Sequence, residues 1–197
     1  MKFFLILFVF FVLNISMIAQ TKINIKAGSG INNSSTIIKH KITNEYDFVA
    51  AFDNRPAFSF FIGSSFDFLL DKKSTFSINV LFFDKAFFST YISDRIDNSY
   101  LYIPLYWKNL FKEKIGLSFG IVNNILLKSY FNENHTMKPY NFGLTIGIYY
   151  LFKNNVEFSF EIQADIDPYS SINVFNQYQL AYNYGAMLSV SYKLFEK

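Results

Sequence analysis

Residues 156–166, VEFSFEIQADI, alternate without a break between apolar and polar side chains. The apolar set is Val156, Phe158, Phe160, Ile162, Ala164 and Ile166, and the polar set is Glu157, Ser159, Glu161, Gln163 and Asp165. Alternation with a period of two predicts a β-strand with one apolar face and one polar face. At about 3.3 Å per residue this strand is about 36 Å long, and a tilt of about 45° lets it cross an apolar band about 25 Å tall.

Seven further segments alternate in a similar way and are expected to be strands: 22–31, 56–70, a segment that starts at Thr75, 99–110, 115–127, 141–152 and 180–194. In the third of the eight, LFFDKAFF at 81–88 is apolar on both faces, which leaves its direction open. Long connections at 32–55, 90–98, 128–140 and 167–179 alternate with short ones at 71–74, 111–114 and 153–155. An up-and-down barrel places all short turns at one end and all long loops at the other. The predicted fold is therefore an all-β, eight-stranded, antiparallel, up-and-down transmembrane β-barrel.

Residues 1–19 have the features of an export signal. Lys2 precedes an apolar core at 3–13, FFLILFVFFVL, and Ala19 offers a small residue for cleavage. The alternative is a membrane-anchoring helix, but the core is shorter than the roughly 20 apolar residues that a span needs. We expect 1–19 to be a signal peptide and 20–197 to form one barrel domain, because no shift in composition suggests a second domain.

The next question is which face of the barrel points outward, because a soluble barrel that carries a hydrophobic ligand would alternate as well. The chain holds 26 Phe and 14 Tyr, and its apolar faces carry roughly 40 large side chains, too many for the narrow interior of eight strands. The polar faces contain small residues that leave room in a lumen: Gly28, Gly63, Gly116, Gly120, Gly143, Gly147 and Gly185. We expect the apolar face to point outward into lipid.

Aromatic residues near the strand ends are candidates for the girdles at the two membrane interfaces. They are Tyr100, Tyr102, Trp107, Tyr149, Tyr150, Tyr182, Tyr184 and Tyr192. Ordinary strand propensity explains any one of them equally well.

The expected lumen contains charged side chains, and buried charges are rarely left unpaired. The predicted polar network consists of Glu157, Glu161, Asp165, Lys193, Lys26 and Lys108, with Lys22 also available. Its expected role is structural, through ion pairs that fix the strand packing. The alternative is a path for protons or small ions, which a filled eight-stranded barrel disfavours.

Several kinds of chemistry find little support in the sequence. The chain has no Cys, which excludes disulfides, a cysteine nucleophile and zinc–thiolate sites. The two histidines, His40 and His135, fall in expected loops without a Ser–His arrangement at membrane level. The acidic pairs Asp94 and Asp97, and Asp165 and Asp167, have no calcium-loop spacing. A net charge of +3 is too small and dispersed for nucleic-acid binding. We expect no catalytic residue, metal or cofactor.

Two blocks of sequence resemble a known family. YLYIPLYWKNLF at Tyr100–Phe111 is similar to the "Y-L-x-I-P-L" strand of the PorT-like outer-membrane β-barrel proteins of Bacteroidetes-type bacteria. NFGLTIGIYYLF, VEFSFEIQ and AMLSVSYKLF are similar to that family's last three strands. The resemblance covers most of the expected mature chain. It implies a Gram-negative outer-membrane barrel, with a partner in a secretion or surface-assembly system, since PorT is associated with type IX secretion.

The leading hypothesis is a non-enzymatic outer-membrane protein with a structural, accessory or surface-interaction role. Its expected partners are outer-membrane lipid, the barrel assembly machinery and a protein that contacts the exposed loops, at 32–55, 90–98, 129–140 and 167–179. Two alternatives stay open: a membrane-embedded lipid-modifying hydrolase, and a soluble periplasmic carrier of a hydrophobic ligand.

Overall fold

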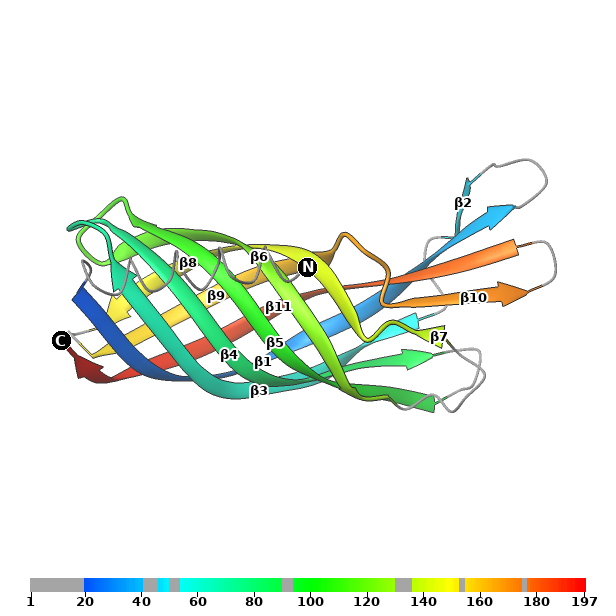
Figure 1. Cartoon of the computed structure of the whole chain (residues 1–197), viewed down its shortest axis with the longest axis horizontal. Helices are drawn as coiled ribbons and strands as arrows, with labels where there is room; N and C mark the ends of the chain where they lie inside the picture. Colours follow the sequence, from blue (N-terminus) through cyan, green and yellow to red (C-terminus); the bar gives the residue numbers. More distant parts are fainter. Residues whose placement is uncertain are drawn as a thin grey trace, which may run out of the picture.

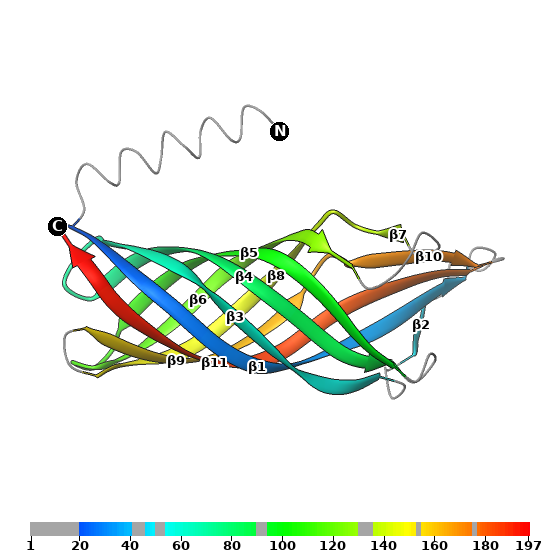
Figure 2. The same ribbon diagram turned by 90° about the horizontal axis from the view of Figure 1, so that it is seen from below.

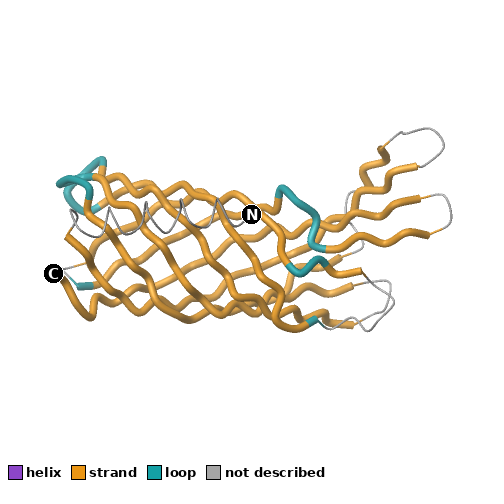
Figure 3. The backbone as a smooth tube through the Cα atoms, in the orientation of Figure 1, coloured by secondary structure: helices purple, strands orange, loops and turns teal. Residues whose placement is uncertain are grey.

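The computed structural model describes residues 20–40, 46–49, 54–89, 94–129, 136–152, 155–174 and 177–197. The expected signal peptide, 1–19, lies outside these residues. The described part of the chain contains eight long strands and three additional short strands (Figures 1 and 3). The long strands are β1 Gln20–His40, β3 Asn54–Leu69, β4 Ser74–Ser89, β5 Asp94–Leu110, β6 Ile115–Lys128, β8 Tyr140–Phe152, β9 Val156–Asp165 and β11 Gln177–Glu196. The short ones are β2 Tyr46–Val49, β7 Thr136–Met137 and β10 Ser170–Val174.

The long strands form a closed antiparallel sheet in the order β1-β3-β4-β5-β6-β8-β9-β11, and β11 pairs with β1 to complete the ring. The pairing of β1 with β11 runs from Lys22↔Glu196 to His40↔Gln177. This confirms the predicted up-and-down transmembrane β-barrel with its eight strands among the described residues. Figure 2 shows the strands tilted around the barrel axis. None of the described residues forms a helix that is long and apolar enough to cross a membrane.

The short turns lie at one end of the barrel and the long connections at the other; we call these the short-turn end and the long-loop end. Asp71 fixes the turn between β3 and β4, because its Oδ1 accepts hydrogen bonds from the backbone N–H groups of Lys73 and Ser74, each at 2.7 Å. Asx-type bonds of this kind favour tight turns. The first and last described strands both have their outer ends, Gln20 and Glu196, at the short-turn end (Figure 1).

The structure corrects the prediction of long irregular connections at 32–55 and 167–179. β1 continues to His40, and the second connection contains β10 and the start of β11. Residues 33–40 of β1 pair with 177–184 of β11, while β2 and β10 pair along their other edges. These segments carry no apolar–polar alternation because a sheet beyond the membrane has no lipid-facing side, so period two cannot reveal it.

Side-chain exposure gives the orientation of the two faces. Phe158, Phe160 and Ile162 of β9 point outward and are 46%, 41% and 52% exposed. Between them, Ser159 and Glu161 point inward and are buried. The prediction that the apolar face points outward is therefore confirmed.

The prediction of aromatic girdles is wrong for Tyr100, Tyr102 and Tyr149, whose side chains are buried inside the barrel. Trp107, Tyr150, Tyr184 and Tyr192 do point outward and are exposed, and Tyr182 is half-buried. The inward tyrosines fill space that facing glycines leave. A Cβ atom placed on Gly116, for example, would overlap the ring of Tyr149.

Candidate functional site

The lumen carries most of the buried polar side chains, and it is the candidate site. Near the short-turn end, Lys108 Nζ donates to Glu157 Oε1 at 2.8 Å and to Oε2 at 3.1 Å. The same ammonium lies 3.7 Å from Asp67 Oδ1. Asn24 Nδ2 donates to Asp67 Oδ2 at 2.9 Å. One lysine therefore bridges two carboxylates beneath an open cavity of about 160 Å³ at this mouth of the barrel.

Glu161 forms the centre of a second cluster. Its Oε1 accepts hydrogen bonds from Lys26 Nζ at 2.6 Å and from Ser159 Oγ at 2.9 Å, and its Oε2 accepts one from the Tyr106 hydroxyl. Lys26 Nζ also lies 5.2 Å from the centroid of the Tyr106 ring. Both charged groups are buried, which costs desolvation free energy. The direct ion pair and the additional hydrogen bonds to the carboxylate offset this cost.

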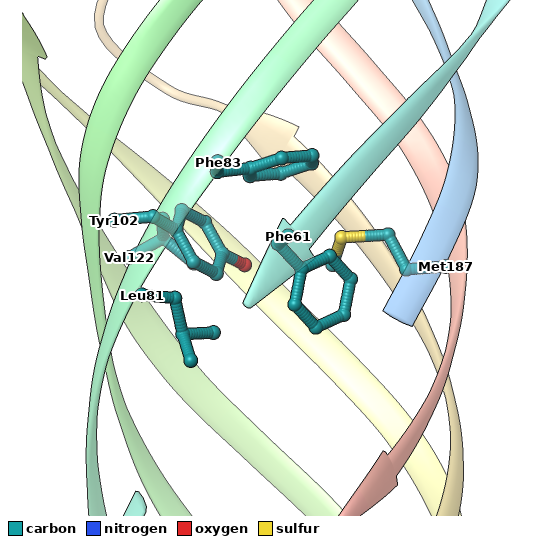
Figure 4. Packing of buried hydrophobic residues seen from close by; sticks show 6 residues of the cluster. All are labelled: Phe61, Leu81, Phe83, Tyr102, Val122 and Met187. Carbon is teal, nitrogen blue, oxygen red and sulfur yellow. The ribbon is translucent and has the colours of Figure 1, made fainter. Parts of the chain in front are cut away.

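Beyond this cluster, towards the long-loop end, an apolar cluster crosses the lumen (Figure 4). We call it the inner apolar cluster; it comprises Phe61, Leu81, Phe83, Tyr102, Val122 and Met187. The ring of Phe83 packs edge-on against Phe61 and Tyr102, with centroids 5.4 Å and 5.0 Å apart. Leu81 and Phe83 thus point inward while Phe82 points outward and is exposed. This resolves the stretch of β4 whose direction the sequence left open.

A polar layer follows the inner apolar cluster. Lys85 Nζ lies 3.9 Å from Asp165 Oδ1 and between 5.3 and 5.5 Å from the ring centroids of Phe83, Tyr100 and Tyr102. Asp165 Oδ2 accepts hydrogen bonds from the backbone N–H and the side-chain amide of Asn183, each at 3.1 Å.

A second apolar cluster, which we call the outer apolar cluster, lies towards the long-loop end. It consists of Phe87, Ile96 and Tyr169, with Met137 and Ala181 packed against it. The ring of Tyr169 meets that of Phe87 at 6.3 Å, and its hydroxyl is hydrogen-bonded to Ser34 Oγ at 2.9 Å. The described lumen thus alternates between polar and apolar layers along its length.

The structure brings together four of the six side chains that the sequence predicts for the lumen, as the pairs Lys26–Glu161 and Lys108–Glu157. Asp165 faces Lys85, which the sequence did not indicate. Lys193 instead lies at the short-turn mouth, where it pairs with Glu196. Lys22, the additional candidate, pairs with the same carboxylate.

Other lumen residues were missed by sequence reasoning. Asp67 lies on the same face of its strand as Gly63 but was not assigned to the network, and Lys85 lies in the stretch that is apolar on both faces. Tyr102 was expected in an aromatic girdle, and Tyr106 was not singled out. Their hydroxyls donate to Gln163 and Glu161.

Candidate metal ligands do not gather among the described residues. Within them, no group of three or more His, Cys, Asp or Glu side chains is placed to hold a metal ion. His135 lies outside the described residues, and only the backbone of His40 is described. Asp97, one of the loop carboxylates, pairs with Arg95 at 2.7 Å.

Several solved structures are similar to this fold. No family model and no curated protein matches the sequence. Neisserial surface protein A has a TM-score of 0.44 and 11% identity, over 87% of this chain and 97% of that one. The outer-membrane protease OmpT from Escherichia coli has 0.46 and 7%, over 88% and 97%. The N-terminal β-barrel domain of Pseudomonas aeruginosa OprF has 0.42 and 10%, over 84% and 97%. At such low values nothing about function follows from these similarities.

The class of the protein rests on its own geometry. Eight tilted long strands in the described chain close on themselves, with an apolar exterior and a packed, largely polar interior. These are the features of an outer-membrane-type β-barrel.

Proposed function

We propose that this protein is an integral, non-enzymatic protein of a bacterial outer membrane that acts through its long-loop end. In this proposal residues 1–19 direct export and are cleaved, outer-membrane lipid covers the apolar exterior, and the barrel assembly machinery inserts the chain. The long-loop end then faces the cell exterior, because short turns face the periplasm in barrels of this type.

The observation that carries this proposal is the sheet that extends beyond the barrel at the long-loop end (Figure 1). β1 and β11 stay paired as far as His40↔Gln177, while β2 pairs with β1 and β10 with β11. β7 adds a further short pairing to β10. A membrane anchor alone does not need ordered strands past its apolar band. A sheet in this position suits contact with another macromolecule at the cell surface.

The filled lumen supports the same proposal. Ion pairs and two apolar clusters occupy it along the described strands, which disfavours a role in transport through the barrel. The resemblance to PorT-like proteins supports a protein partner from a secretion or surface-assembly system. We therefore propose a protein partner at the extracellular sheet.

Location is tested first, by membrane fractionation and by adding proteinase K to intact cells. The proposal expects the protein in the outer-membrane fraction, with cleavage in the loops and a protected barrel. Recovery from the soluble periplasm without detergent would contradict it and favour a hydrophobic-ligand carrier. A changed lipid A mass spectrum on deletion of the gene, restored by the wild-type chain but not by His135→Ala, would favour a lipid-modifying hydrolase.

The partner is tested by photo-crosslinking in living cells. A photoreactive amino acid at Ile172 in β10 or Phe48 in β2 should give a discrete protein adduct. The matched controls are Phe160 and Ile146, which point outward from the barrel wall and should give no such adduct. If positions scanned across β2, β7 and β10 all fail to give an adduct under conditions where the protein is functional, the surface-contact role is wrong.

A further inference from the structure

Buried polar atoms without a hydrogen-bond partner gather at one level of the lumen. Among the described side chains there are eight such atoms, and five of them belong to Lys85, Tyr100, Asn124 and Asn141. They are Lys85 Nζ, the Tyr100 hydroxyl, both amide atoms of Asn124 and Nδ2 of Asn141. Buried polar groups in proteins are nearly always paired, with protein or with ordered water. Several buried donors at one level of the described lumen therefore have no protein acceptor within hydrogen-bond distance.

The four residues come from four strands that the barrel brings to one level. Asn124 of β6 and Asn141 of β8 stand directly opposite each other in the register. Gly143, which lies two residues after Asn141 on the same face of β8, stands opposite Asp165 of β9. Lys85 of β4 lies against both the Tyr100 ring and the Asp165 carboxylate. These side chains, with Asp165, form the layer that we call the polar layer.

The polar layer is closed along the barrel axis. The inner apolar cluster bounds it towards the short-turn end, and the outer apolar cluster bounds it towards the long-loop end. Phe83, Tyr100 and Tyr102 also present their rings to the Lys85 ammonium, which carries three N–H donors and has no acceptor within hydrogen-bond distance in the described structure. A partner for this layer must be small and polar.

We propose that the polar layer is a binding site for a small cluster of enclosed water molecules. One water would accept from Lys85 Nζ and donate to Asp165 Oδ1, which lie 3.9 Å apart, beyond direct hydrogen-bonding distance. A second would bind the amide of Asn124, both of whose polar atoms lack a hydrogen-bond partner, beside Asn141 on the neighbouring strand. The ion pair at this level is then mediated by water, unlike the direct pairs Lys26–Glu161 and Lys108–Glu157.

Charge favours water over an anion, although most of the unpaired atoms are donors. Lys85 and Asp165 already balance each other within the layer. The neighbouring Lys26 is likewise matched by Glu161, so an added anion would meet no unmatched positive charge. Neutral water satisfies donors and acceptors without that repulsion.

The test is NMR of the full barrel in detergent micelles, which detects long-lived water through nuclear Overhauser cross-peaks. Cross-peaks to water are expected at the amide groups of Asn124 and Asn141 and absent at Leu81 and Val122 in the inner apolar cluster. Asn124→Leu should abolish the Asn141 peaks. Asn123→Leu, the same change on the outward face of β6, should keep them.

Two outcomes would overturn the proposal. The first is the absence of water cross-peaks at Asn124 and Asn141 in the wild-type barrel, which would mean that the layer is dry. The second is an anomalous peak beside Lys85 in crystals grown with sodium bromide, which would assign the layer to an anion. Both measurements use the unmodified chain, so they decide the question even where Asn124→Leu fails to fold.

Discussion

Glu161 is the residue whose surroundings best explain why a charge can lie inside this barrel. It accepts hydrogen bonds from Lys26, Ser159 and Tyr106, which come from three different strands. Because each donor is buried, removing the carboxylate leaves the Lys26 ammonium without a partner in a space that water enters poorly. The loss therefore exceeds the value of one hydrogen bond.

We expect Glu161→Leu to destabilise the folded barrel by about 3–5 kcal/mol, the usual cost of breaking a buried ion pair from one side. The change should appear as a lower midpoint of urea unfolding in lipid vesicles and as earlier loss of heat-modifiable migration on a gel. Adding Lys26→Met should recover a large part of the loss, because the double variant carries no unpaired charge. Unchanged migration and midpoint for Glu161→Leu alone would rule out this role for the pair.

Residues differ in how well the sequence predicts their place. Glu157 and Glu161 lie on a strand with strict alternation, so their inward direction follows from period two. Lys85 lies among phenylalanines on both sides, and its direction depends on neighbouring strands that local sequence does not specify. Tyr102 and Tyr106 lie on the same inward face of β5. An aromatic residue such as Tyr102 also suits the membrane interface, so the sequence leaves both locations open. The packing of the barrel interior shows that Tyr102 points inward.

At the scale of elements, strand cores were predictable and strand ends were not. The predicted 141–152 and 156–166 differ from β8 and β9 by one residue at one end each. β1, in contrast, continues nine residues past the C-terminal end of its predicted segment, because this extension is stabilised by backbone pairing with β11 rather than by burial of one face. Pairing between distant segments leaves no periodic trace in either of them.

The close approach at Gly28 gives a prediction for β1. A Cβ atom at this position would overlap the backbone oxygen of Leu188 and the ring of Phe61. We expect Gly28→Val to destabilise the barrel by about 1–3 kcal/mol through overpacking. Ala27→Val, on the exposed face of the same strand, should change the urea midpoint little. Equal midpoints for the two variants would contradict an inward, crowded position for Gly28.

The turn between β3 and β4 gives a second prediction at this scale. The backbone N–H groups of Lys73 and Ser74 lower the pKa of Asp71 below its ordinary value. A lowered pKa in the folded state means that the carboxylate stabilises the turn at neutral pH and that this contribution disappears as pH falls through the folded pKa. Asp71→Ala should therefore lower the melting temperature at pH 7.

The pH dependence supplies the control for that turn. Wild type and Asp71→Ala should differ at pH 7 and converge in strongly acidic buffer, where the carboxyl is protonated in both folded and unfolded chains. Lys72→Ala, an exposed change in the same turn, should match wild type at both values. A difference between wild type and Asp71→Ala that is constant from pH 7 to pH 3 would show that the charge is not responsible.

At the scale of the whole molecule, the layered lumen leaves the barrel without a continuous open channel along the described strands. Direct ion pairs, the inner apolar cluster and the outer apolar cluster follow one another along the described strands. We expect the purified protein to give no steady ion conductance in planar lipid bilayers. A reproducible unit conductance from folded protein, absent from heat-denatured protein, would contradict this description of the lumen.

The pairing of β1 with β11 also determines at which stage of folding the barrel can close. The strands that close the ring are the first and the last along the described chain, so contacts such as Lys22↔Glu196 join the two ends of its described part. Until β11 takes its place, β1 and β9 each present an unpaired edge, which a lipid environment does not tolerate. Closure of the ring is therefore a late step in folding, and it carries a large entropic cost because it joins distant segments. Before closure, the two unpaired strand edges are open to pairing with other polypeptides.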